Sequence, residues 1–102
     1  MKIEDLLIKL GFNVSTKGFN YWIEAVRIYN KFDKMEDVYG LIATNNRDTR
    51  NRVERAMRVT REQANKNIKE YFNYNFRIGN KTLLHLLKLE MHKSTIYGRI
   101  KE

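Results

Sequence analysis

The sequence predicts an all-α fold of about six helices, on the strength of three observations. None of the 102 residues is proline, the residue that most strongly interrupts helices. Apolar side chains recur three and four positions apart, which places them on one face of a helix. Polar residues and single glycines separate these periodic segments, as expected of short turns. A chain of this length suits one domain over residues 1–102 with a modest hydrophobic core.

Three helices are expected in the first half of the chain, over residues 3–10, 19–32 and 35–44. The first has apolar residues at i, i+3, i+4 and i+7, and Gly11 can end it. The second repeats this spacing after a break at Gly18. The third should bury Val38, Leu41 and Ile42. The apolar faces of the first two helices are Ile3, Leu6, Leu7 and Leu10, and Trp22, Ala25, Val26 and Tyr29.

Three more helices are expected over residues 49–64, 67–74 and 80–92. Asp48 is a candidate N-cap for the first of them, with Thr49 as the alternative. Asn80 is expected to cap the last helix, which is apolar nearly all round and is therefore either deeply buried or part of a subunit contact. Residues 94–102 show no periodicity and are expected to form a loosely ordered tail.

Residues 35–66 have the pattern of a helix-turn-helix, in which the second helix protrudes and enters the major groove of DNA. Ala43 is small enough to lie where the two helices cross. Asn45, Asn46 and Arg47 are expected to form the turn, because asparagine tolerates positive φ. Val53 and Ala56 would anchor the second helix. The expected domain is winged-helix-like, without an evident wing. A purely structural helical hairpin needs similar residues, so this pattern alone does not establish DNA binding.

The positive charge of the chain is concentrated on this second helix. Residues 1–46 hold six basic and six acidic side chains, whereas residues 47–69 hold eight basic and three acidic ones. The net charge of the whole chain is +8. Charge gathered on one segment indicates a surface that faces a polyanion, although a solvated helix face is the alternative.

The arginines on the outer side of the second helix favour double-stranded DNA. A guanidinium can donate two hydrogen bonds to O6 and N7 of guanine, so Arg52, Arg55 and Arg58 are candidates for contact with DNA. Glu54 either accepts from cytosine or holds an arginine in place; an i, i+4 pair with Arg58 is the structural alternative. We expect contacts with the phosphate backbone or supporting roles from Arg47, Arg50, Asn51, Arg52 and Arg61.

Two blocks of the sequence resemble a known family. The first is residues 8–11 with KGFNYWIEAV at 17–26, and the second is Tyr39, Ile42, Ala43 and Thr49 with RVERAMR at 52–58. These blocks are similar to the C-terminal effector domains of the sporulation response regulator, stage zero sporulation protein A. The resemblance covers most of residues 3–92, and the second block matches the family's recognition helix.

The resemblance implies a six-helix, non-enzymatic effector domain that binds a short box containing G and C, often as a head-to-tail pair on adjacent boxes. It implies that Glu54, Arg55 and Arg58 read bases, and that Arg52 touches phosphate. The partners expected from it are double-stranded DNA, a second copy of the chain on an adjacent box, and RNA polymerase.

Two rival functions remain open at this point. One is a stand-alone interaction module or antagonist that pairs with a full-length regulator or with RNA polymerase. The other is a non-specific nucleic-acid binder. The aromatic side chains Phe19, Tyr21, Trp22 and Tyr29 could stack on single-stranded bases, but core packing is the better interpretation because Trp22 and Tyr29 share an apolar helix face.

Other classes of function have little support in the sequence. Without cysteine, and with only His85 and His92 spaced seven apart, we expect neither a metal site nor a cofactor. No glycine-rich phosphate loop and no nucleophile context is present, so we expect no catalysis. The apolar run around His85 is too short to cross a bilayer, and the first ten residues do not resemble a signal peptide, so we expect a cytoplasmic protein.

Overall fold

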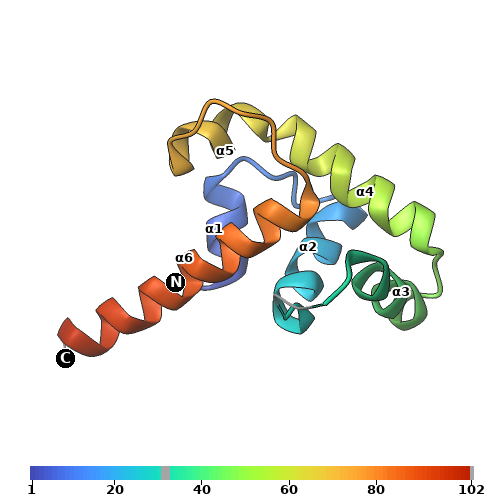
Figure 1. Cartoon of the computed structure of the whole chain (residues 1–102), viewed down its shortest axis with the longest axis horizontal. Helices are drawn as coiled ribbons and strands as arrows, with labels where there is room; N and C mark the ends of the chain where they lie inside the picture. The colour runs from blue at the N-terminus through green and yellow to red at the C-terminus, as the bar shows by residue number, and fades with distance from the viewer. Residues whose placement is uncertain (31–32, 102) are drawn as a thin grey trace.

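The computed structural model describes residues 1–30 and 33–101, with the side chains of 94–101 excepted, and contains six helices within them. They are α1 (Ile3–Lys9), α2 (Lys17–Ile28), α3 (Met35–Asn46), α4 (Arg50–Gln63), α5 (Asn65–Phe72) and α6 (Asn80–Lys101) (Figure 1). No strand occurs in this part of the chain. The all-α prediction is therefore confirmed.

The ends of the first two helices follow from local signals. Gly11 follows the end of α1, as the sequence predicted, and its φ of 85° is a left-handed conformation that glycine adopts without strain. α2 begins two residues before the predicted start, because the hydroxyl of Thr16 accepts from the backbone N–H of Phe19 at 3.2 Å. The helix ends at Ile28, since Tyr29 is extended. Residues 31–32, which the prediction placed in this helix, lie outside the described part.

Trp22 on α2 lies at the centre of the core. Its ring is fully buried, and its indole N–H donates to the backbone carbonyl of Met57 on α4 at 2.9 Å. This bond satisfies the single donor of the ring and ties α2 to α4. The other large side chains that are fully buried come from the remaining five helices and from Leu10, directly after α1: Leu6, Leu7, Leu10, Ile42, Val53, Met57, Ile68, Leu83, Leu84 and Leu87.

One predicted core residue of α3 lies outside. Val38 and Ile42 are buried, as expected, but 47% of Leu41 is exposed. Ala43 is buried as well, which turns the inner face of the helix toward that residue and away from Leu41. The prediction for Leu41 was therefore wrong.

α2 and α4 cross at Gly18, where their backbones come close together. A Cβ atom on Gly18 would lie 1.9 Å from the Thr60 hydroxyl oxygen and 2.5 Å from the carbonyl oxygen of Ala56. Only glycine fits such a crossing. The sequence predicted a break at Gly18, but this residue is the second residue of α2 and sets how closely α2 packs against the helix expected to read DNA.

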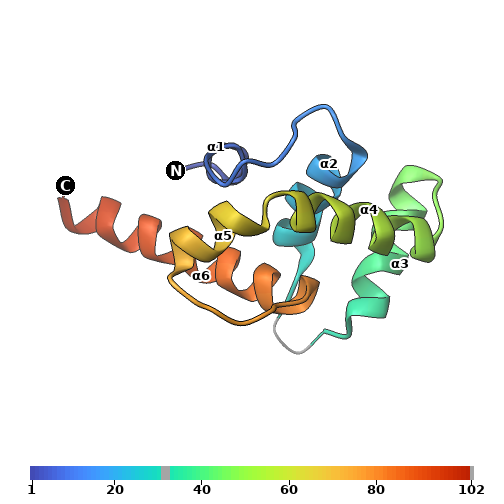
Figure 2. The ribbon, with the colours of Figure 1, turned by 90° about the horizontal axis from the view of Figure 1, so that it is seen from above.

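The last two helices cover the remaining side of the core. α5 starts at Asn65, directly after Ala64, which is earlier than predicted. Asn80 was expected to be an N-cap; it is instead the first residue of α6, and its side chain points inward. The backbone of residues 94–101, expected to be a loose tail, continues α6 as helix. The end of α6 is the part of the fold farthest from α3 (Figures 1 and 2).

Candidate nucleic-acid interface

α3 and α4 form a helix-turn-helix whose turn is centred on Arg47. Arg47 adopts a left-handed conformation with φ 53° and ψ 43°, and the next N–H, from Asp48, donates to the carbonyl of Ala43 at 2.9 Å. Of the predicted turn over residues 45–47, Arg47 lies in the turn, but Asn45 and Asn46 remain in α3, so the prediction was wrong for the two asparagines. Their amides donate to the carboxylate of Glu24 on α2 at 2.7 and 2.8 Å, which holds them in the helix.

Thr49, and not Asp48, caps α4. The Thr49 hydroxyl accepts from the N–H of Arg52 at 3.2 Å, which satisfies a donor that the first turn of a helix leaves open. The carboxylate of Asp48 accepts from the Tyr21 hydroxyl at 2.5 Å and from the N–H of Thr49 at 2.9 Å. These bonds hold the pKa of Asp48 below its ordinary value. Burial, with Asp48 nearby, raises the pKa of Tyr21 to about 12.

The bond between Tyr21 and Asp48 predicts a pH-dependent stability. A lowered carboxyl pKa stabilises the fold above the ordinary value of about 4, and this contribution is lost as the pH falls through the lowered pKa. The raised pKa of Tyr21 preserves the bond up to about pH 10. Tyr21→Phe should therefore lower Tm by a few degrees at pH 7 and by less at pH 2.5, as thermal melts would measure.

Tyr74→Phe is the matched control, because the buried Tyr74 hydroxyl has no hydrogen-bond partner among the described residues. Its effect on Tm should not change between pH 2.5 and pH 7. If the effect of Tyr21→Phe on Tm were equally independent of pH, the role given to Asp48 would be contradicted.

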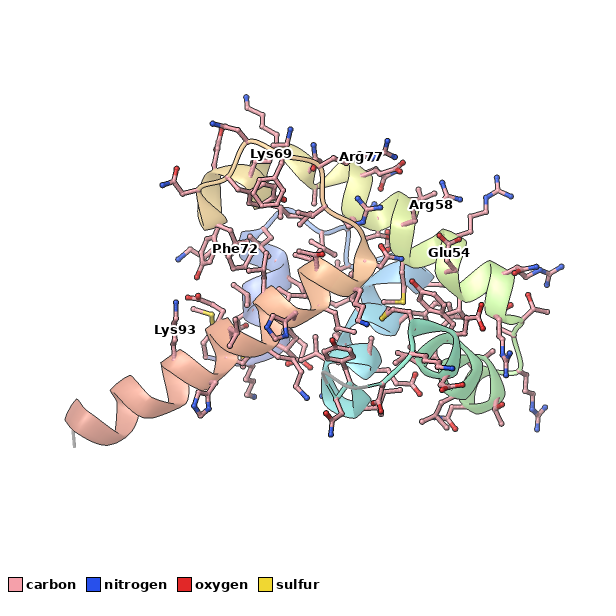
Figure 3. All side chains as sticks on the ribbon, viewed as in Figure 1. Glu54, Arg58, Lys69, Phe72, Arg77 and Lys93 are labelled. Carbon is pink, nitrogen blue, oxygen red and sulfur yellow. The ribbon has the colours of Figure 1, made fainter. Side chains whose placement is uncertain are left out.

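The two sides of α4 differ as the periodicity predicted. Val53 and Met57 are fully buried, and Thr60 and Ala64 are buried nearly as deeply. On the opposite side Asn51, Arg52 and Arg55 are exposed, and Glu54 and Arg58 are partly exposed. Figure 3 shows Glu54 and Arg58 on the outer edge of α4, away from the body of the domain. The side chains expected to read DNA are therefore outside.

Glu54 and Arg58 form an ion pair one helical turn apart. The Nε of Arg58 lies 3.0 Å from Oε1 of Glu54, and the two side chains are 42% and 37% exposed. A pair this exposed contributes only a few tenths of a kcal/mol to stability. The pair places the Arg58 guanidinium beside the Glu54 carboxylate in the free domain.

Arg61 is not part of the outer surface, contrary to expectation. Only 6% of it is exposed; its Nε donates to Oδ1 of Asn80 at 2.8 Å and its Nη1 to the carbonyl of Ile78 at 2.9 Å. The Asn80 amide then donates to the Tyr39 hydroxyl at 3.0 Å. Burial lowers the pKa of Arg61. At eight positions after Val53, Arg61 lies on the inner flank of α4, a spacing that the sequence already contained.

Arg47 and Arg50 are exposed at the start of the recognition segment. The side chain of Arg50 lies against α3, since a Cβ atom on Gly40 would be 2.7 Å from its Nε. Gly40 therefore leaves room for Arg50 next to the turn. Together with Arg52, these side chains extend the basic surface around the first turns of α4.

The chain matches the family model described as sporulation initiation factor Spo0A C terminal, over residues 3–91. It belongs to this family. Spo0A C-terminal domains are non-enzymatic, DNA-binding transcriptional effector domains. The matched residues span α1 to α5 and most of the described side chains of α6, so this Spo0A-type domain includes the whole helix-turn-helix. Comparison with curated proteins and with solved structures gave no match.

Within the described residues, no three side chains of histidine, cysteine, aspartate or glutamate gather as metal ligands would. Over the same part of the chain, none of the helices has the length and apolar character needed to cross a bilayer.

Proposed function

We propose that this domain is a sequence-specific, double-stranded DNA-binding transcriptional regulator with α4 in the major groove. The observation that carries the proposal is that Arg52 and Arg55 are exposed, and Arg58 partly exposed, on a helix whose opposite face is buried. A helix with its side chains is about 10–12 Å across, and the major groove is about 12 Å wide. Exposed guanidinium groups on such a helix can reach the edges of bases.

The proposed roles follow from chemistry and from position on α4. Arg55 and Arg58 read guanine through O6 and N7, since a guanidinium can donate to both atoms at once. Glu54 either accepts from cytosine N4 or keeps Arg58 in place, as its 3.0 Å ion pair supports. The remaining side chains near the start of α4 contact phosphates or support the other contacts; they are Arg47, Arg50, Asn51 and Arg52.

Selection of bound sites from a random duplex library tests this function. We expect a short box containing G and C to emerge, and the selected duplex to bind about a thousandfold or more tighter than a scrambled duplex of the same composition. Both affinities are measured at one stated salt concentration, because contacts with phosphate make them salt-dependent. A ratio near one would contradict sequence-specific binding and favour the non-specific alternative.

We further propose head-to-tail pairing of two copies on adjacent boxes. Light scattering with duplexes that carry one or two boxes should show one copy and two copies bound, respectively. A stable dimer that forms without DNA and ignores it would instead favour the interaction module or antagonist, which would pair with a full-length regulator or with RNA polymerase.

A further inference from the structure

A cleft of about 400 Å³ lies between the start of α2 and the outer flank of α4. Its lining comes from both helices: Thr16, Lys17, Gly18, Arg52, Arg55, Ala56, Val59, Thr60 and Gln63. The cleft exists because α2 and α4 approach closely at Gly18 while their outer side chains diverge. Arg55, the central residue of the proposed reading surface, is also one of its walls.

The cleft is strongly basic. Three of its lining residues are the cations Lys17, Arg52 and Arg55, all exposed, and none of the described residues that line it is acidic. Asp48 acts electrostatically with Lys17 and Arg52, but its oxygens already accept from Tyr21 and Thr49. The cleft therefore favours an anion.

Part of the lining of the cleft is apolar. Gly18, Ala56 and Val59 supply apolar surface, and 39% of Val59 is exposed. An anionic strand with alternating phosphates and deoxyribose rings matches this arrangement, because phosphates can contact the cations while sugars contact the apolar part of the lining.

The position of the cleft beside α4 indicates which part of a DNA duplex it would hold. If α4 lies in the major groove, the backbone strand that forms one wall of the groove must run along a flank of α4. We propose that the cleft between α2 and α4 holds this sugar–phosphate strand, and that Lys17 donates to one of its phosphates beside Arg52. The inference rests on the proposed function and adds α2 to the DNA-binding surface. The prediction that began the helix at residue 19 left Lys17 outside it.

Lys17→Ala tests the contact on the selected duplex. We expect affinity to fall about fivefold to tenfold at 0.1 M salt, and the slope of log K against log salt to decrease in magnitude by about 0.9, the effect of one lost phosphate contact. Lys17→Arg should keep most of the affinity. Lys93→Ala removes the same charge from α6, far from Glu54 and Arg58 (Figure 3), and should change affinity less than twofold.

Neutral methylphosphonates, placed one at a time along the duplex, locate the contact by a double-mutant cycle. At one or two adjacent phosphates, the methylphosphonate should weaken binding by the wild type but should not weaken binding by Lys17→Ala, which has already lost the contact. Additive losses at every position, or equal effects of Lys17→Ala and Lys93→Ala, would overturn the inference. In that case the wild type would still prefer its box over scrambled DNA, and the proposed function would stand. A wild-type preference near one would contradict both.

Discussion

Gly18→Ala is expected to destabilise the domain by about 3 kcal/mol, a large effect for one methyl group. The new Cβ would lie 1.9 Å from the Thr60 hydroxyl oxygen and 2.5 Å from the carbonyl oxygen of Ala56. The second of these atoms belongs to the backbone of α4 and cannot rotate away. The two helices would have to separate, which would also strain the bond from Trp22 to Met57 across the same contact.

Urea denaturation followed by circular dichroism measures this loss. Gly79→Ala is the matched control, because a Cβ atom there would meet nothing within 4 Å, and it should change the free energy of unfolding by less than about 0.5 kcal/mol. Thr60→Ala combined with Gly18→Ala should recover only part of the loss, since the carbonyl of Ala56 remains. Similar free energies of unfolding for Gly18→Ala and Gly79→Ala would show that the helices do not cross as closely as described.

Arg61→Met is expected to destabilise the domain by about 3 kcal/mol, because buried hydrogen bonds from a charged group contribute about 1.5–3 kcal/mol each. Methionine keeps much of the buried volume but leaves Oδ1 of Asn80 and the carbonyl of Ile78 without their donors. Asn80 would also be freed from the geometry in which it donates to Tyr39 on α3. Arg61 thus joins α4, α3 and the start of α6.

Arg55→Met makes the same chemical change on the outer side of α4, and should alter the free energy of unfolding by less than about 0.5 kcal/mol. The two variants therefore separate a structural arginine from a DNA-facing one. If Arg61→Met were as stable as Arg55→Met and bound DNA with a smaller salt slope than the wild type, Arg61 would have to be assigned to the DNA interface.

The helix faces could be predicted from the sequence, whereas the helix ends were harder to predict. Val53 and Met57 are spaced so that any helix through them buries both. The end of α3 depends instead on Glu24, which holds Asn45 and Asn46 from a helix more than twenty residues earlier. The usual preference of asparagine for positive φ was overridden by this tertiary contact, and Arg47 adopted the left-handed conformation.

The candidate site was predicted only as far as the periodicity of α4 allows. That period places Arg55 outside, and applied to Arg61 it gives the inner flank that the structure shows. The cleft beside Lys17 could not be predicted, because it depends on how closely α2 approaches α4 at Gly18. A pattern of residues within one helix contains no information on that distance.

The central claim is that side chains on the outer side of α4, with Arg55 among them, read bases. Its most direct test is the affinity of Arg55→Ala for the selected duplex and for each single-base variant of that duplex. The account predicts a loss of about 1–3 kcal/mol on the selected duplex, with discrimination lost at one base pair and kept at the others. The same loss on the selected and scrambled duplexes, with all discrimination intact, would contradict it.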